Sequence, residues 1–315
     1  MYDELGRNIR YLRLSVTDRC NCRCLYCMPV HGVSMLRHED ILSFEEMRAI
    51  VEASAQLGVR KVRLTGGEPL ARRGIVDLVR MVSAVEGIEE VVMTTNATLL
   101  VPLAKDLKEA GLSRLNISLD TLDSELYTKL SRTGTLDDAL AGIEAAREAG
   151  FIHTKFNTVL LGGLNESEIR PLAERAKSEP VDVRFIELMR MGECSKWPAE
   201  RFISADCVLK VLPELEAVGS NGVTELFQAP GWRGRVGLIR PMTHTFCCSC
   251  DRIRVTADGM LKPCLHSARE IPLRGLVGDE LVQVLRQGIS QKPEGHIMSL
   301  SHASESLRAM NKIGG

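Results

Sequence analysis

Eight of the ten cysteines in this 315-residue chain fall into two groups near its opposite ends. The first group is Cys20, Cys22, Cys24 and Cys27, and the second is Cys247, Cys248, Cys250 and Cys264. Thiols at such short spacings are typical ligands of zinc or of iron–sulfur clusters, whereas disulfide frameworks are typical of small secreted proteins. The cysteines therefore predict metal or redox chemistry. We interpret the two isolated cysteines, Cys194 and Cys207, as small hydrophobic residues.

The first group, "CNCRCLYC", offers three thiolates in the spacing Cys20-x3-Cys24-x2-Cys27. A structural zinc ion normally takes four protein ligands, so three thiolates make a poor zinc site, although zinc knuckles share the C-x2-C pair. A [4Fe–4S] cluster held by three thiolates instead keeps one iron open for a further ligand. Cys22 would crowd Cys24, so we expect it outside the ligand set.

The second group also offers three thiolates, in the spacing Cys247-x2-Cys250-x13-Cys264. Three thiolates again leave one coordination site of a [4Fe–4S] cluster open. Cys248 directly follows Cys247, which makes the register ambiguous, and we interpret Cys248 as a bystander.

The composition limits which partners this chemistry can serve. Forty basic and 41 acidic residues give a formal net charge of −1, so no overall field favours nucleic acid or a membrane surface. No apolar run approaches the roughly 18 residues that span a bilayer, and the N-terminus lacks the apolar core of a signal peptide. We expect a soluble, cytoplasmic protein that binds neither nucleic acid nor membranes, with any anion-binding site confined to a local cavity.

Six short extended segments alternate with amphipathic stretches over the first 190 residues. The segments are "YLRLSVT", "KVRLTGG", "VVMTTN", "RLNISLD", "TKFNTVLL" and "VRFIELM". Among the helical stretches, Ser43 is a plausible N-cap of "SFEEMRAIVEASAQLG", and Gly150 closes "TLDDALAGIEAAREAG". Strands that alternate with helices in this way predict βαβ units and a parallel sheet.

These strands are apolar on one face only. In the first, leucine and valine alternate with Arg13, Ser15 and Thr17. Helices can cover the apolar face, and the polar face then has to line a ligand cavity, which a curved sheet provides. Six units fall short of the eight that close a full barrel, so we predict an α/β fold with an incomplete (β/α)6 TIM-type barrel. An antiparallel sheet with one wet face is the alternative.

Four cations occupy these strands, where charge is costly unless it meets an anion: Arg13, Arg63, Lys155 and Arg184. Their convergence on one cavity predicts a polyanionic ligand such as a nucleotide triphosphate. For any one of them, an internal salt bridge explains the charge equally well.

The loop "CNCRCLYC" resembles the signature loop of radical S-adenosylmethionine enzymes. That resemblance implies a cluster whose open iron binds S-adenosylmethionine, which is then cleaved to a 5′-deoxyadenosyl radical. "TGGEP" at residues 65–69 resembles the second element of that superfamily, although such a stretch is also typical of an ordinary turn. These motifs, "FCCSCDRIRVTADGMLKPCL" and the terminal "IGG" together resemble the GTP 3′,8-cyclases of molybdenum-cofactor biosynthesis over essentially the whole chain.

The resemblance implies a role for each matching residue. The metal ligands are Cys20, Cys24, Cys27, Cys247, Cys250 and Cys264. The S-adenosylmethionine contacts are Tyr26, Gly66, Gly67, Glu68, Ser118 and Met189. The GTP contacts are Arg13, Arg63, Thr94, Lys155, Arg252 and Arg254, with Arg184 at the border of the cavity. Ala97 in "TTNAT" departs from the pattern, because a glycine is expected there.

The implied architecture is a partial barrel over residues 1–195 and a smaller iron–sulfur domain over residues 196–315. The implied reaction, in the lyase class, makes (8S)-3′,8-cyclo-7,8-dihydroguanosine 5′-triphosphate from GTP, the first step of molybdenum-cofactor biosynthesis. The radical takes the C3′ hydrogen and derives from the cofactor, so no side chain is assigned as catalytic. The implied partners are a flavodoxin-type or chemical reductant and the next enzyme of the pathway, and the sequence is compatible with a homodimer.

Composition alone predicts that Gly314 and Gly315 form a disordered end, whereas the resemblance places them in the active site. Two other functions use the same cysteines. One is a peptide-modifying radical enzyme, which often carries more C-terminal cysteines and a docking region before the barrel. The other is a zinc or iron–sulfur regulator that binds nucleic acid, against which the near-neutral charge counts.

Overall fold

The computed structural model describes residues 1–314. Six parallel strands form the centre of one twelve-stranded sheet, and each lies within one of the segments predicted from the sequence or starts one residue before it. They are β1 (Tyr11–Ser15), β2 (Lys61–Thr65), β3 (Glu90–Thr95), β4 (Arg114–Ser118), β5 (Lys155–Leu160) and β6 (Asp182–Glu187). The predicted α/β fold with a barrel-like parallel sheet is confirmed.

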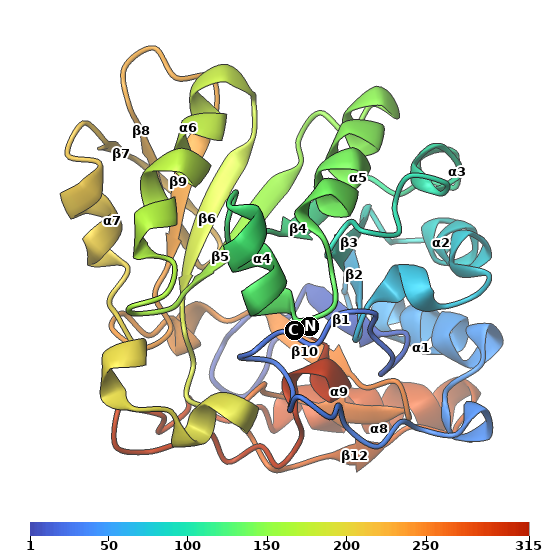
Figure 1. The fold of residues 1–315 in the computed structure, drawn as a ribbon. Coiled ribbons are helices and arrows are strands. Elements are labelled where there is room, and N and C mark those ends of the chain that lie inside the picture. Colours follow the sequence, from blue (N-terminus) through green and yellow to red (C-terminus); the bar gives the residue numbers. More distant parts are fainter. Residues whose placement is uncertain (315) are drawn as a thin grey trace.

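Helices connect these strands and cover the outside of the curved sheet (Figure 1). They are α1 (Phe44–Gln56), α2 (Ile75–Ser83), α3 (Ala104–Glu109), α4 (Ser124–Ser131), α5 (Leu136–Glu148) and α6 (Ile169–Ser178). Side chains such as Leu12 and Leu14 point into the apolar core between sheet and helices, where they are fully buried. Arg13, between them, faces the inside of the sheet and is 8% exposed. The alternation in the sequence therefore separates a hydrophobic outer layer from a polar interior.

The helix ends follow the local sequence. Ser43 caps α1, because its Oγ accepts from the backbone N–H of Glu46 at 3.1 Å and the Glu46 carboxylate accepts from the Ser43 N–H at 2.7 Å. Gly150 follows α5 with a φ of 84°, a left-handed conformation that glycine adopts readily. Both predicted ends are confirmed.

The C-terminal part of the chain extends the sheet at both edges. On one side, β10 (Arg252–Val255) pairs parallel to β1, followed by antiparallel β11 (Met260–Lys262) and β12 (Ile271–Pro272). On the other side, β9 (Arg235–Ile239) pairs parallel to β6, followed by antiparallel β8 (Thr224–Gln228) and β7 (Glu216–Asn221). Strands from both sides of residue 195 thus share one sheet, and the division into domains there stays a prediction.

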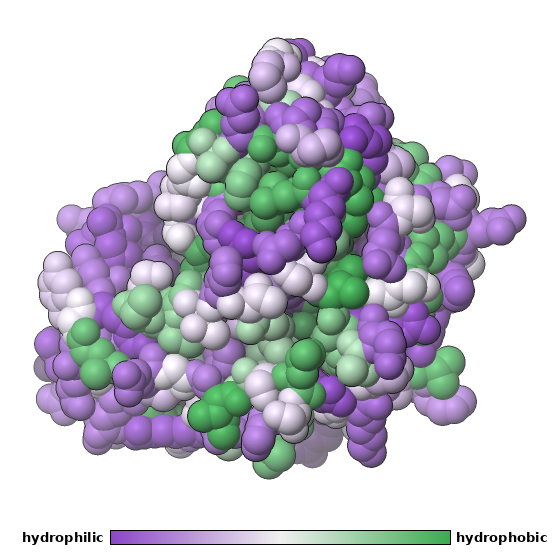
Figure 2. Space-filling view, turned by 90° about the vertical axis from the view of Figure 1, so that its left-hand side faces the viewer, coloured by the Kyte–Doolittle hydropathy of each residue, from purple (hydrophilic) through white to green (hydrophobic). Residues whose placement is uncertain are grey.

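Three further helices belong to this C-terminal part: α7 (Asp206–Val211), α8 (Gly278–Ser290) and α9 (Met310–Ile313). Of these, α8 packs against α1 and β11. Figure 2 shows a face of the molecule on which hydrophilic side chains predominate, with hydrophobic ones gathered in one patch in the upper centre of the view and scattered elsewhere. Within residues 1–314, no helix has the length and apolar character needed to cross a bilayer.

Candidate functional site

The inner face of the sheet surrounds a cavity of about 780 Å³. Nearly all predicted site residues line it: Arg13, Cys20, Cys24, Tyr26, Cys27, Arg63, Gly66, Gly67, Glu68, Thr94, Ser118, Lys155, Arg184, Met189, Cys247, Cys250, Arg252, Arg254 and Cys264. Gly314 lies beside Thr65, another lining residue. Gly315 lies outside the described residues. The structure therefore brings both cysteine groups and the strand cations to one space.

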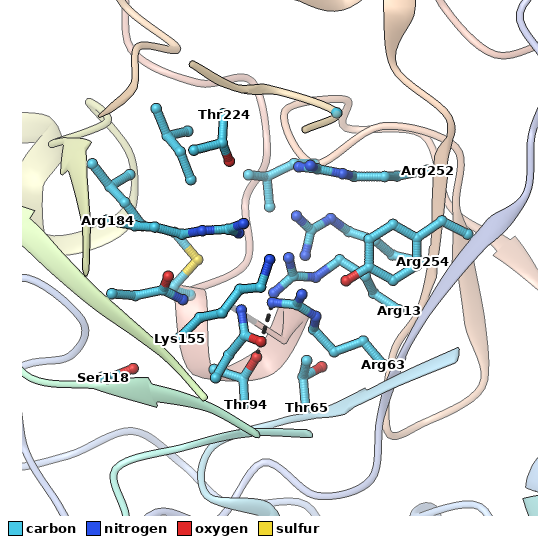
Figure 3. Close-up of a pocket in the computed structure, with 18 of the residues that line it drawn as sticks. Arg13, Arg63, Thr65, Thr94, Ser118, Lys155, Arg184, Thr224, Arg252 and Arg254 are labelled. Carbon is cyan, nitrogen blue, oxygen red and sulfur yellow. Dashed lines mark hydrogen bonds between the residues drawn. The ribbon is translucent and has the colours of Figure 1, made fainter. Parts of the chain in front are cut away.

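Six cationic side chains point toward a common centre in this cavity (Figure 3): Arg13, Arg63, Lys155, Arg184, Arg252 and Arg254. Burial and, to a smaller extent, the neighbouring Arg252 together lower the pKa of Arg254 to about 10. Burial likewise lowers the pKa of Lys155 to about 8, with a further contribution from Arg184. Positive charges that disfavour one another in this way are stabilised by an anion between them.

An acidic residue that the sequence analysis missed holds part of this cluster. The Asp182 carboxylate lies 3.0 Å from Lys155 Nζ, 3.5 Å from an Arg184 nitrogen and 2.9 Å from Arg235 Nε. Lys155 and Arg184 therefore make the internal salt bridges that the sequence left open, while they also face the cavity. On the opposite wall, Arg63 donates to the Thr94 hydroxyl at 3.3 Å.

The sequence analysis also missed other lining residues: Tyr11, Lys61, Arg114, Asn116 and Thr224. Three of these could have been found from the alternation alone. Tyr11 precedes Arg13 by two positions and Lys61 precedes Arg63 by two, so each pair shares one face of its strand. Asn116 is related to Ser118 in the same way. Thr224 belongs to β8, which pairs with β9 and β7, and no local pattern indicates the place of this strand in the sheet.

The first cysteine loop is fixed by backbone hydrogen bonds to the end of α4. The N–H groups of Arg23 and Leu25 donate to the carbonyls of Ser131 and Leu130, each at 2.9 Å. Cys20, Cys24 and Cys27 are partly exposed toward the cavity, and all ten cysteines are free thiols. Burial raises the pKa of Cys27 to about 12, so its thiolate needs a nearby positive charge such as a metal.

Tyr26 joins this loop to the end of β4. Its hydroxyl donates to the Asp120 carboxylate at 2.7 Å, and the second oxygen of Asp120 accepts from the backbone N–H of Val159 at 2.8 Å. Burial raises the pKa of Asp120 to about 6. The aromatic residue between Cys24 and Cys27 is thus held at a defined position beside the predicted cluster.

Cys22 has a different environment from its neighbours. It is 2% exposed, and its Sγ accepts from the side-chain amide of Asn96 at 3.3 Å. The same amide donates to Asn21 at 2.9 Å. Cys22 Sγ also lies within hydrogen-bonding reach of the Cys20 and Cys24 thiols. Its exclusion from the ligand set stays a prediction.

The glycines at 66 and 67 pack against the chain that leads into the cysteine loop. The Gly67 N–H donates to the Thr17 carbonyl at 2.8 Å, and a Cβ at Gly66 or Gly67 would overlap the backbone of Thr17 or Arg19. Glycine is therefore required at both positions for the close approach of the two segments. The two glycines thus have a structural role in packing against Thr17 and Arg19, in addition to the predicted contact with S-adenosylmethionine.

Glu68 follows these glycines and is almost fully buried. Its carboxylate accepts from the Thr95 hydroxyl at 2.7 Å and from the Asn96 N–H at 2.8 Å. Burial raises the pKa of this carboxyl to about 7. Ala97, which follows Asn96, has a φ of 65°, a left-handed conformation that suits the glycine expected there from the family resemblance.

The second cysteine group lies at the same cavity, beside β10. Cys247, Cys250 and Cys264 are partly exposed, whereas Cys248 is exposed and does not line the cavity. Burial raises the pKa of Cys250, but the positive charges of Lys292 and Arg252 outweigh that effect and lower it overall. The chain thus presents a second set of three thiols, one of which is already shifted toward its metal-binding thiolate form.

The C-terminal segment enters the barrel. Arg254 donates to the Gly314 carbonyl at 2.5 Å, and the Asn311 side chain donates to the Asp18 carbonyl at 3.1 Å. Gly314 has a φ of 81°, and a Cβ there would overlap the Thr65 hydroxyl. The penultimate residue is therefore buried and ordered, in contrast to the disordered end that composition alone predicts.

Each cysteine group fits a [4Fe–4S] cluster by the number and chemistry of its thiols. Within the described part of the chain, no three His, Cys, Asp or Glu side chains already converge as metal ligands do. The cationic surroundings of the second group suit an anionic cluster.

Comparison with known proteins agrees with this geometry. Residues 14–176 match the family model of the radical SAM superfamily, and residues 181–298 match the model described as Molybdenum Cofactor Synthesis C. In fold, the chain is similar to Streptococcus suis SuiB bound to its precursor peptide, with a TM-score of 0.63 and 16% identity, over 91% of this chain and 67% of that one. The sheet, the cysteine loop and these matches define a radical S-adenosylmethionine enzyme, which implies a [4Fe–4S] cluster and S-adenosylmethionine.

Curated relatives narrow this class. The chain is 46% identical to the GTP 3′,8-cyclase of Peptoclostridium acidaminophilum, over 100% of this chain and 98% of the relative. It is 44% identical to the GTP 3′,8-cyclase of Alkaliphilus metalliredigens, over 100% of both chains. The chain therefore belongs to the GTP 3′,8-cyclase family.

Proposed function

We propose that this protein converts GTP to (8S)-3′,8-cyclo-7,8-dihydroguanosine 5′-triphosphate as the first step of molybdenum-cofactor biosynthesis, with two [4Fe–4S] clusters. One observation carries the proposal: two sets of three thiols and six inward cations line the same cavity. Thiols alone suit many metalloproteins, and cations alone suit many anion sites. Thiols and cations that line the same cavity suit a radical enzyme whose substrate is a nucleotide polyanion.

The first cluster is held by Cys20, Cys24 and Cys27. When bound there, the cluster and S-adenosylmethionine supply the radical that abstracts the hydrogen from C3′ of GTP. The chain's part is to orient the reactants: Tyr26, Gly66, Gly67, Glu68, Ser118 and Met189 form the cofactor side of the cavity. The buried Glu68 carboxyl, fixed by Thr95 and Asn96, is placed to accept a hydrogen bond from an ammonium group.

Cys247, Cys250 and Cys264 would hold the second cluster, whose open iron would supply a binding position for the guanine. Arg13, Arg63, Thr94, Lys155, Arg252 and Arg254 hold the triphosphate, with Arg184 at the border. Their fixed positive charge replaces the water around the phosphates and orients C3′ toward the radical source. The terminal Gly314 and Gly315 are assigned to the active site in this proposal, in which Arg254 binds both the carbonyl of Gly314 and the substrate.

The proposal includes partners outside this cavity. An external donor, of flavodoxin type or a chemical reductant, supplies the electron that starts each turnover, and the next enzyme of the pathway takes the product. We propose a cytoplasmic location, because closely spaced cysteines that serve as cluster ligands are typical of reducing compartments. The homodimer stays a prediction.

The test is anaerobic incubation of the iron-reconstituted protein with GTP, S-adenosylmethionine and a strong reductant. We expect about eight irons per chain, with 5′-deoxyadenosine and the cyclised nucleotide formed together. Cleavage of S-adenosylmethionine with GTP left intact would refute the substrate assignment. A colourless zinc protein would refute the radical mechanism.

A further inference from the structure

Tyr11 stands at the first position of β1, at the wall of the cavity. In the register of the sheet it lies beside Lys61 of β2 on one side and Arg252 of β10 on the other. The side chain lines the cavity, and the residue is only 6% exposed. Neither the cysteine motifs nor the cations on the strands assign a function to Tyr11.

The phenol oxygen of Tyr11 is buried and has no hydrogen-bond partner within residues 1–314. A buried hydroxyl without a partner is costly, and tyrosines in protein interiors usually find one. The Tyr11 side chain lies on the central strand β1, between β2 and β10. An unpartnered hydroxyl on a cavity wall therefore points to a ligand that completes it.

The surroundings define what that ligand offers. Lys61 Nζ, Arg63 Cζ and Arg252 Cζ lie 5.3, 5.5 and 5.7 Å from the ring centroid. Lysine and arginine side chains donate hydrogen bonds and do not accept them, so none of these neighbours can accept from the phenol O–H. The acid on the next strand, Glu90, is already paired with Lys61 and with Arg114. The missing acceptor is therefore an anionic oxygen brought in by the ligand.

We propose that the Tyr11 hydroxyl donates a hydrogen bond to a phosphate oxygen of the substrate and so belongs to the polyphosphate site. The inference rests on the proposed function for the identity of the nucleotide. The electrostatics agree, because the cations around the phenol outweigh its burial and lower its pKa, which makes the O–H a stronger donor. The Tyr11 hydroxyl is an uncharged donor among cations, and its single hydrogen bond is directional. It therefore fixes the position of one phosphate oxygen.

Tyr11→Phe isolates this hydrogen bond, because it keeps the ring and its contacts with the cations. Binding is measured anaerobically on the iron-reconstituted full-length protein, with GTP, guanosine and inorganic tripolyphosphate as separate probes. We expect the Kd for GTP and for tripolyphosphate to rise about tenfold, as for a lost hydrogen bond to a charged group. The Kd for guanosine and the iron content should stay unchanged. The matched control is Tyr2→Phe, which removes the hydroxyl of a residue that is 65% exposed.

The probes separate the possible outcomes. Unchanged GTP and tripolyphosphate binding in Tyr11→Phe overturns the inference and leaves the proposed function intact. Equal losses for GTP and guanosine also overturn it, because they indicate a structural role. A wild-type protein that binds tripolyphosphate through Tyr11 but does not cyclise GTP supports the inference and refutes the proposed function.

Discussion

Lys155 and Asp182 form an ion pair of 3.0 Å between the first residues of the neighbouring strands β5 and β6, inside the cavity. The same carboxylate also pairs with Arg184 and Arg235. A carboxylate in a polyanion site repels the substrate, so its presence needs a compensating effect. That effect is preorganisation: Asp182 holds three cations that line the cavity in place before the triphosphate arrives.

Lys155→Ala should weaken GTP binding by about tenfold, because a charge-assisted contact to a phosphate is lost. Guanosine binding should change little. The loss should be larger at low salt, where charges are least screened. Titration calorimetry of both ligands at two salt concentrations measures this. Lys105→Ala on α3, whose side chain is 84% exposed, is the control. Equal losses for GTP and guanosine would place Lys155 away from the triphosphate.

GTP affinity should also depend on pH through Lys155. Burial lowers the pKa of its ammonium group to about 8 in the free protein. The charged form binds phosphate, so affinity should be full below about pH 8 and fall as pH rises through that value. In Lys155→Ala this step should disappear, whereas the control Lys105→Ala should keep it. A wild-type affinity that is flat from about one pH unit below to about one pH unit above the lowered pKa of Lys155 would contradict the assignment.

Cys20, Cys24 and Cys27, each changed to Ser, should lose the first cluster and all cleavage of S-adenosylmethionine, because a hard hydroxyl replaces a soft thiolate on iron. Cys22→Ser should keep both, since its Sγ is engaged by Asn96 and a serine hydroxyl can accept the same hydrogen bond. Iron content and 5′-deoxyadenosine formation are the measurements. If Cys22→Ser loses iron as severely as Cys24→Ser, the ligand set in this loop is wrong.

The local sequence was sufficient to predict the parts of the fold that depend on periodicity. Alternating residues in β1 and β2 placed Arg13 and Arg63 inside the sheet, and the same alternation could have added Tyr11 and Lys61. The edges of the sheet were beyond such reasoning, because β10 pairs with β1 across some 240 positions of the sequence. No local pattern specifies a pairing between parallel strands so far apart.

The site was predictable to the same extent. Cysteine spacing and strand charges indicated which residues carry chemistry, and the structure brings them to one cavity. The pairing of Asp182 with Lys155 required the register of β5 and β6, which the sequence does not contain. The left-handed conformation of Ala97 also had no signal beyond the expected glycine at that position.

Changing Cys250 or Cys264 to Ser should remove the second cluster and spare the first. Such a variant should still cleave S-adenosylmethionine slowly but should not cyclise GTP, because the proposed function assigns radical formation and guanine binding to different cysteine groups. Iron analysis and product analysis on the same sample separate the two effects. Cys248→Ser, at an exposed thiol outside the cavity, is the matched control. Normal cyclisation with only one cluster present would contradict the two-cluster site.

Ala97→Gly should change stability little despite the unusual backbone. Glycine relieves roughly 1–2 kcal/mol of left-handed strain. It loses about 0.8 kcal/mol of methyl burial and about 0.5–1 kcal/mol of backbone entropy. The apparent melting temperature should therefore shift by less than about 3 °C. Gly142→Ala in α5 is the contrasting variant, because its Cβ would overlap the Ala97 carbonyl and should lower the melting temperature clearly. Equal shifts in both variants would contradict this close packing.

The final prediction concerns the C-terminal glycines. Gly314→Val should abolish GTP cyclisation, because its Cβ would overlap the Thr65 hydroxyl and approach Ser15 Cβ to 3.4 Å, in a backbone conformation with a φ of 81° that valine resists. Removal of Gly314 and Gly315 should act in the same direction, since Arg254 loses the carbonyl that it binds. Neither change replaces a cysteine or a strand residue, and the short terminal segment can shift away from Thr65, so iron content and melting temperature should stay close to those of the intact protein. Leu307→Ala, at a side chain of the same segment that is 96% exposed, should keep full activity. A truncated protein with unchanged cyclisation would show that the ordered tail has no part in the reaction.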